Sequence, residues 1–166
     1  MGFGTYIKRK YLAICAKIVR EPASPEYIAR GWAIGMFYGC AIPFGLQLVL
    51  SIPTSFMLRG SKIGATLGTL ITNHITVFFI YPLQCYIGSL FLPGDSNFAE
   101  IRQSMLQVAE QQSFSSLSAL TGRLVASFFV GGILFAAIMT PLTYIGVLKL
   151  VKARRERKLA RRLSHR

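Results

Sequence analysis

Charged side chains are absent from long stretches of this 166-residue sequence. No Asp, Glu, Lys, Arg or His occurs in Gly31–Leu58 or in Leu124–Leu148, and His74 is the one such residue in Ile63–Leu92. About 20 apolar residues suffice to cross the hydrocarbon core of a bilayer, and a soluble domain rarely carries uncharged runs of this length. The sequence therefore predicts an all-α integral membrane protein with three membrane-embedded helical segments.

The sequence also lacks the residue patterns of active sites and metal sites. Its three cysteines, Cys15, Cys40 and Cys85, are scattered and form no CxxC pair, so neither a disulfide framework nor a zinc site is indicated. There is no HExxH motif, no glycine-rich phosphate loop with its lysine, and no serine or cysteine with a plausible histidine base. We therefore expect no enzyme activity, no catalytic residues, no metal and no cofactor.

Acidic residues are few, and the basic residues gather at the two ends of the chain. Lys and Arg total 19 against 6 Asp and Glu, which gives a net charge of +13. The basic residues lie mainly before Gly31 and after Leu148, whereas the connection Pro93–Arg123 contains Asp95, Glu100 and Glu110. Under the positive-inside rule, both termini are predicted to be cytoplasmic and the connection to lie outside.

Three complete spans would place the termini on opposite sides, so we expect one segment to enter the membrane and return. The run Gly31–Leu58 is the better candidate, because its halves, about Arg30–Ala41 and Leu46–Leu58, flank a break at Pro43-Phe44-Gly45. Each half would extend about 18 Å, which reaches the middle of the core but does not cross it. The alternatives are three full spans with the C-terminal tail outside, or two re-entrant early segments.

The second run is broken by the polar residues Asn73, His74 and Thr76. A non-helical backbone at membrane depth must be lined by protein or water, and transporters place their sites at such breaks. Gln47 is the expected partner from the first run, because its amide both donates and accepts hydrogen bonds. The candidate substrate-binding residues are therefore Pro43, Gly45, Gln47, Asn73, His74 and Thr76. The alternative interpretation is a polar contact that only holds two broken helices together.

Three cations flank the first run, and we predict that they bind an anionic headgroup: Arg30, Arg59 and Lys62. Guanidinium and ammonium groups beside a cavity would suit a phosphate or a carboxylate. Their simpler interpretation is that of ordinary cytoplasmic anchors.

The sequence predicts three parts. Residues 1–22 form an amphipathic cytoplasmic helix, 23–151 form the membrane domain, and 152–166 form a basic cytoplasmic tail. Ser24 and Pro25 indicate a helix start, and another short helix is predicted after Asn97. The tail continues the third helix, which favours anionic lipid as its partner; nucleic acid is an unlikely partner because no aromatic residues are interleaved. Gly132 and Ala136 allow close helix approach within the monomer or in a homo-oligomer.

Three sequence motifs carry a family resemblance. They are an Ala-x-Gly-x-Ala-x-Gly opening at 29–35, a Pro-x-Gly-x-Gln break at 43–47 and an Asn-x-x-Thr break at 73–76. Over about Ser24 to Leu92, and loosely into the third helix, the chain resembles the domain of unknown function 2062 family of small bacterial integral membrane proteins. His74 stands where that family usually has proline. The resemblance implies an all-helical domain of the bacterial inner membrane, sometimes joined to glycosyltransferase-like domains, and no established activity.

Two functions fit these observations. The first is a small transporter or flippase-like protein for an anionic lipid or lipid-linked headgroup, with a site between the two broken helices and self-association supplying the rest of the path. The second is a non-catalytic accessory protein that binds a membrane enzyme such as a glycosyltransferase. An ion channel is less favoured, because the sequence has no acidic ring or repeated carbonyl filter.

Overall fold

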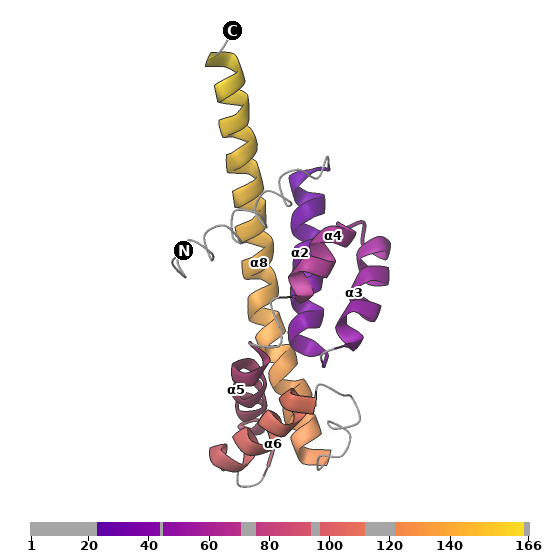
Figure 1. Ribbon diagram of the computed structural model, residues 1–166, viewed down its shortest axis with the longest axis vertical. Coiled ribbons are helices and arrows are strands. Elements are labelled where there is room, and N and C mark those ends of the chain that lie inside the picture. The colour runs from indigo at the N-terminus through magenta and orange to yellow at the C-terminus, as the bar shows by residue number, and fades with distance from the viewer. Residues whose placement is uncertain (1–22, 44, 71–75, 94–96, 112–121, 165–166) are drawn as a thin grey trace.

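The chain is all-helical in the part that the structure describes. This computed structural model describes residues 23–43, 45–70, 76–93, 97–111 and 122–164, which form six helices and no strand (Figure 1). The long helix α8 (Gly122–Ser164) is the axis of the molecule. Helices α2, α3 and α4 lie together along its middle, and α5 and α6 lie near its N-terminal end (Figure 1). The prediction of an all-α fold is confirmed.

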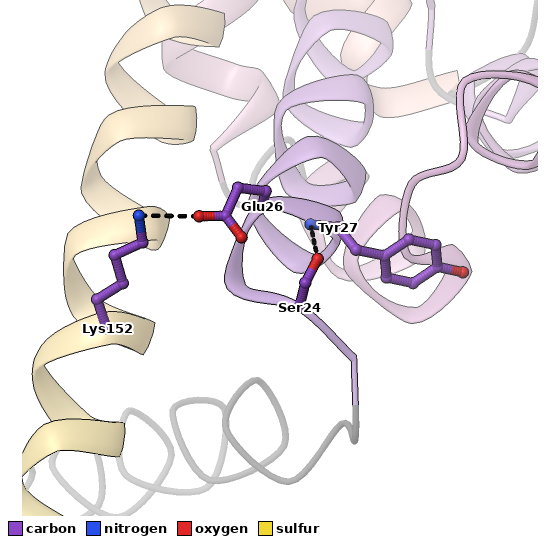
Figure 2. Close-up of polar contacts among 4 residues, drawn as sticks. All are labelled: Ser24, Glu26, Tyr27 and Lys152. Carbon is purple, nitrogen blue, oxygen red and sulfur yellow. Dashed lines mark hydrogen bonds and ion pairs between the residues drawn. The ribbon is translucent and has the colours of Figure 1, made fainter.

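The first apolar run folds as a helical hairpin. Helix α2 (Pro25–Ala41) begins where the hydroxyl of Ser24 accepts a hydrogen bond from the backbone N–H of Tyr27 at 3.1 Å (Figure 2). It ends before Pro43, which disfavours helical geometry in the preceding residue. Gly45, at a φ of 97°, then leads into α3 (Leu46–Met57). The hydroxyls of Tyr38 and Thr54 lie 2.9 Å apart across the hairpin. The predicted break of this run is confirmed.

The second run forms two separate helices. Helix α4 (Lys62–Thr69) begins with Ser61, whose hydroxyl accepts from the backbone N–H of Gly64 at 2.8 Å. Helix α5 (Val77–Ser89) follows Thr76. Helix α4 therefore ends before the predicted break at 72–76, and α5 begins after it. Of this break, only Thr76 lies within the described residues.

Helices α2 and α4 pack backbone to backbone through glycines. A Cβ atom added to Gly31 would collide with the carbonyl oxygen of Ser61, and one added to Gly35 would collide with that of Ala65. Gly68 faces Gly35 in turn, so that small residues on both helices make the contact. Small residues at the contact permit this close approach.

Helix α8 is the longest element in the described part of the chain. Its 43 residues extend about 65 Å at 1.5 Å per residue, about twice the thickness of a bilayer core. Over Gly122–Arg157 it is long and apolar enough to cross a membrane, and it alone has that property in the described part of the chain. Gly132 and Ala136 pack against the C-terminal end of α2, so this small-residue pair is used within the monomer.

Helix α6 (Phe98–Gln111) starts directly after Asn97, as predicted, and the Asn97 side chain accepts a hydrogen bond from the N–H of Ala99 at 3.0 Å. Its inward side chains Ile101 and Met105 join an apolar cluster with α5 and α8. The remaining buried members of that cluster are Val77, Tyr81, Cys85 and Phe128. Core packing is therefore a role of α6. The predicted N-terminal amphipathic helix lies outside the described residues.

Candidate functional site

Helix α3 turns polar side chains inward and large apolar side chains outward. Gln47, Ser51 and Ser55, which are four residues apart, are almost completely buried. Val49 and Met57 are 65% and 79% exposed. A helix on the surface of a water-soluble protein has the opposite arrangement. Gln47 was expected from the sequence and the two serines were not, although their four-residue spacing was the available signal.

Gln47 connects the two broken runs. Its amide Nε2 donates to the carbonyl oxygen of Thr69 at 3.4 Å, a long hydrogen bond. Gln47 lies in the first turn of α3 and Thr69 is the last residue of α4, so the contact lies where each helix adjoins its break. Gln47 therefore contacts the second run at Thr69, the last residue of α4. Asn73 and His74 lie outside the described residues, and a contact between Gln47 and His74 stays a prediction.

The hydroxyl groups nearby bind the backbone of their own helices. Ser55 donates to the carbonyl oxygen of Ile52 at 2.7 Å, and Thr69 donates to that of Thr66 at 2.8 Å. Ser51 lies 3.5 Å from the carbonyl oxygen of Leu48. Such local bonds satisfy a buried hydroxyl without a partner on another helix. These residues fit close helix packing, whereas the Gln47 amide bridges two helices.

The three predicted headgroup residues lie together at the turn between α3 and α4. Arg30 Nη1 donates to the carbonyl oxygen of Leu58 at 3.1 Å, and the Lys62 ammonium lies 4.9 Å from the centre of the Phe56 ring. Arg59 lies in the turn itself, and all three cations are exposed. The turn is attached to α2 by a hydrogen bond from the N–H of Ser61 to the carbonyl oxygen of Tyr27, at 3.0 Å.

Arg59 has a backbone conformation that favours glycine. Its φ is 50°, and α3 ends in a Schellman motif in which the N–H of Gly60 binds the carbonyl oxygen of Ser55 at 2.7 Å and the N–H of Arg59 binds that of Phe56 at 3.2 Å. A left-handed conformation costs a residue with a Cβ atom about 1–2 kcal/mol. Glycine would form this turn more easily, so the turn geometry does not explain the arginine.

The beginning of α2 and the basic part of α8 lie side by side. The Lys152 ammonium binds the Glu26 carboxylate at 2.8 Å (Figure 2). Arg155 donates a hydrogen bond to the carbonyl oxygen of Ala23. The hydrogen bond from Lys152 lowers the pKa of Glu26. Ser61, in the α3–α4 turn, is bound to Tyr27 of α2, the residue next to Glu26. The cations of this turn and those of α8 therefore lie at the same end of the group formed by α2, α3 and α4. The hairpin thus begins and ends at the same end of the group formed by α2, α3 and α4.

A buried amide in the second run was not expected from the sequence. Gln84 of α5 is completely buried, and its Nε2 donates to the carbonyl oxygen of Phe128 at 3.0 Å. Its Oε1 and the hydroxyl of Ser127 have no hydrogen-bond partner within the described residues. Gln84 also lies against Gly132, which in turn contacts Cys40 and Ala41 at the end of α2. Gln84 therefore lies where the two helix groups meet, and an amide in an otherwise apolar run was the signal that could have identified it.

The structure thus places the predicted residues in two sets. Pro43 and Gln47 are buried at the first break, where Gly45 is exposed, and Thr76 directly precedes α5 at the second. Arg30, Arg59 and Lys62 lie at the opposite end of the hairpin, at the α3–α4 turn. The binding roles of both sets stay predictions.

Comparison with known proteins gives one finding. The profile of a family described as an uncharacterized protein conserved in bacteria (DUF2062) matches residues 8–160. No curated protein and no solved structure matches the chain. The resemblance drawn from the sequence motifs is confirmed.

Proposed function

The chain belongs to the family of uncharacterized proteins conserved in bacteria (DUF2062), and from its site we propose that it binds the anionic headgroup of a membrane lipid or lipid-linked molecule and passes it between two broken helical segments. The cations Arg30, Arg59 and Lys62 receive the headgroup. The path follows the two breaks, with Pro43, Gly45, Gln47, Asn73, His74 and Thr76 as its candidate residues.

The outward face of α3 supports a membrane setting. Large apolar side chains of α3 are exposed while its polar side chains are buried, and only 28% of the most apolar part of α8 is buried. Exposed apolar surface of this extent marks an interaction with a membrane or a partner. In hydrocarbon, by contrast, helices pack through small and polar residues, as α2, α3 and α4 do.

The hairpin geometry supports the re-entrant arrangement. A hairpin that begins and ends beside the basic part of α8 returns the chain to the side from which it came. The second run then crosses outward as two short helices, and α8 crosses back. In this arrangement both termini are cytoplasmic, and the protein is a multi-pass protein of the bacterial inner membrane.

The observation that carries the headgroup proposal is the arginine in the left-handed position. The left-handed conformation of Arg59 costs folding free energy that a glycine would not cost. Arg59 lies with Arg30 and Lys62 at an exposed turn. Residues held in unfavourable backbone conformations cluster at binding sites. Guanidinium groups form paired hydrogen bonds with phosphate, which suits the headgroup of an anionic lipid.

The test is the lipid content of the purified protein. The protein is extracted in small native bilayer discs, and bound lipid is identified by mass spectrometry. We expect enrichment of phosphate-bearing anionic lipid over the bulk membrane, and loss of that enrichment in Arg59→Gly and Lys62→Gln. Arg102→Gln, which changes an exposed cation on α6, is the matched control. Equal lipid composition in the wild type and the Arg59→Gly variant would contradict the proposal.

Transport is tested separately from binding. The protein is reconstituted in vesicles that contain a fluorescent anionic lipid, and the fraction of that lipid accessible to an external quencher is followed. We expect faster exchange between leaflets than in empty vesicles, and slower exchange after Gln47→Leu. Binding without accelerated exchange would restrict the function to lipid binding.

A second function is favoured by the C-terminal part of α8. Beyond Lys152, which binds Glu26, the helix continues for about 18 Å to Ser164 and extends past the other helices (Figure 1). Leu159 and Leu163, one turn apart, are exposed on this basic extension. Such a surface suits an acidic partner protein, as expected for an accessory protein of a membrane enzyme. Crosslinking from position 159 to one stoichiometric partner would support this function over transport.

A further inference from the structure

Helix α4 has an apolar hollow on its outer face. The hollow has a volume of about 260 Å³ and is lined by Lys62, Ile63, Thr66 and Leu67. These residues recur at helical spacing on the face opposite Gly64, Ala65 and Gly68, which pack against α2. The close contact with α2 therefore fixes the direction in which the hollow opens.

The lining is apolar apart from its rim. The Thr66 hydroxyl donates to the carbonyl oxygen of Lys62 at 3.0 Å, so it is satisfied within the helix. Leu67 packs against the apolar cluster of Ile28, Trp32 and Val151. At the rim, the Lys62 ammonium is held over the Phe56 ring, next to the turn that contains Arg59. A cation thus borders an apolar depression.

The size of the hollow indicates what it can accept. Pockets that enclose a whole small molecule have volumes of about 300–1,000 Å³. The hollow on α4 is smaller and open, so it can hold part of a molecule. An amphiphile with a negative charge at one end and a hydrocarbon chain attached to it fits both the rim and the lining.

We propose that one acyl chain of an anionic phospholipid lies in the hollow of α4, with its phosphate at Lys62 and Arg59. This inference rests on the headgroup site of the proposed function and identifies its ligand as a two-part molecule, a phosphate with an attached chain. The charge complementarity at the rim distinguishes this lipid from an uncharged or zwitterionic one. Each of these two cations near the membrane surface favours an anionic lipid about fivefold, so the preference is at least about fivefold.

Trp32 provides the measurement, because it is the single tryptophan in the sequence and belongs to the cluster against which Leu67 packs. The full-length protein is reconstituted in phosphatidylcholine vesicles that contain phosphatidic acid, and one of the two lipids carries bromine atoms in the upper part of its acyl chains. Bromine quenches tryptophan fluorescence only at short range. We expect brominated phosphatidic acid to quench Trp32 with a relative association constant at least about fivefold above that of brominated phosphatidylcholine.

Thr66→Phe is the variant that tests the hollow. The phenylalanine ring fills the hollow, and the hydrogen bond that is removed lies within α4. The ratio of the quenching association constants of phosphatidic acid and phosphatidylcholine should therefore fall to about one, while the amount of co-purified phosphatidic acid remains unchanged. Val49→Phe, an equally enlarging change on the exposed face of α3, is the control and should alter neither reading. The emission maximum of Trp32 and the helical circular dichroism signal verify folding in both variants.

The outcomes separate this inference from the function on which it rests. Co-purified phosphatidic acid with equal quenching by both lipids would overturn the acyl-chain site and leave the headgroup site standing. The absence of phosphatidic acid enrichment in the wild type would overturn the headgroup site and the acyl-chain site together. Selective quenching that persists in Thr66→Phe would place the chain elsewhere on the protein.

Discussion

The outer helices of the two groups on α8, α6 and α3, are built in opposite ways. In the α5–α6 group, large apolar side chains lie inside, and Val77, Met105 and Phe128 are completely buried. In the α2–α4 group, the buried residues of α3 are polar, and large apolar side chains such as Phe56 are exposed. The outer helix α6 thus turns apolar side chains inward, whereas the outer helix α3 turns polar side chains inward.

This difference indicates two different origins of stability. The α5–α6 group gains from removing apolar surface from water, with aromatic contacts such as the edge-on pair of Tyr81 and Phe128 at 4.9 Å between ring centres. In the α2–α4 group, apolar side chains such as Ile28 and Trp32 join α2 to α8, whereas the contact of α2 with α4 depends on close backbone packing between glycines. The second arrangement is the one expected where lipid already surrounds the outer face, which is consistent with the membrane setting that we propose.

The largest expected effect compares the same residue type inside and outside. Phe128→Ala should destabilise the protein by about 3–5 kcal/mol, because it removes a completely buried ring and leaves a cavity between α5, α6 and α8. Phe56→Ala, at a 69% exposed position, should change stability much less. Thermal unfolding followed by circular dichroism in the same bilayer discs measures both. Equal losses for the two variants would remove the contrast between the groups.

The next effect tests the glycine contact of the α2–α4 group. Gly35→Ala should cost about 3 kcal/mol, because the added Cβ atom would collide with the Ala65 carbonyl and force α2 and α4 apart. Gly146→Ala on α8 is the matched control: no atom lies within 4 Å of its added Cβ atom, and the lower backbone entropy should stabilise the helix by about 0.5–1 kcal/mol. If Gly35→Ala were as well tolerated as Gly146→Ala, the helices would not be in backbone contact.

A smaller effect of opposite sign is expected at the α3–α4 turn. Arg59→Gly should stabilise the folded protein by about 1 kcal/mol, because glycine adopts the left-handed conformation without the cost of a Cβ atom. The same variant is expected to lose anionic lipid. Thermal unfolding in zwitterionic bilayer discs, where no anionic lipid contributes, measures the effect of the backbone conformation on stability alone. A loss of stability under that condition would show that the arginine side chain supports the turn.

The positions of the breaks were readable from the sequence because they depend on local backbone chemistry. Proline and glycine set the end of α2 at Ala41 and the start of α3 at Leu46, and Asn97 set the start of α6. The same holds for the start of α2, where a serine cap precedes a proline. Arg30 marked only the edge of the uncharged run, and α2 itself starts at Pro25, directly after the predicted cap Ser24.

The orientation of the helix faces could not be read in the same way. Uncharged composition does not distinguish a residue that faces lipid from one that faces another helix, so Ser51 and Ser55 were missed. The role of Gln84 depends on Phe128, 44 residues away in sequence, and no local pattern predicts that contact. The left-handed backbone of Arg59 was also hidden, because Gly60, the residue after it, is the one that a sequence rule would assign to that conformation.

The smallest expected effect concerns the ion pair that joins the α2–α4 group to α8. The hydrogen bond from Lys152 lowers the pKa of Glu26 below its ordinary value of 4.5 in the folded protein. The pair therefore contributes stability that is present above about pH 4.5 and is lost as the pH falls through the lower, folded-state pKa. The contribution is small because both side chains are about half exposed. Glu26→Gln should lower the unfolding temperature slightly at pH 7, and the difference from the wild type should vanish at low pH. Lys152→Gln, which removes the other partner, should likewise approach the unfolding temperature of the wild type at low pH. If the unfolding temperature of Glu26→Gln still differed from that of the wild type at low pH, the effect would belong to the start of α2 and not to the ion pair.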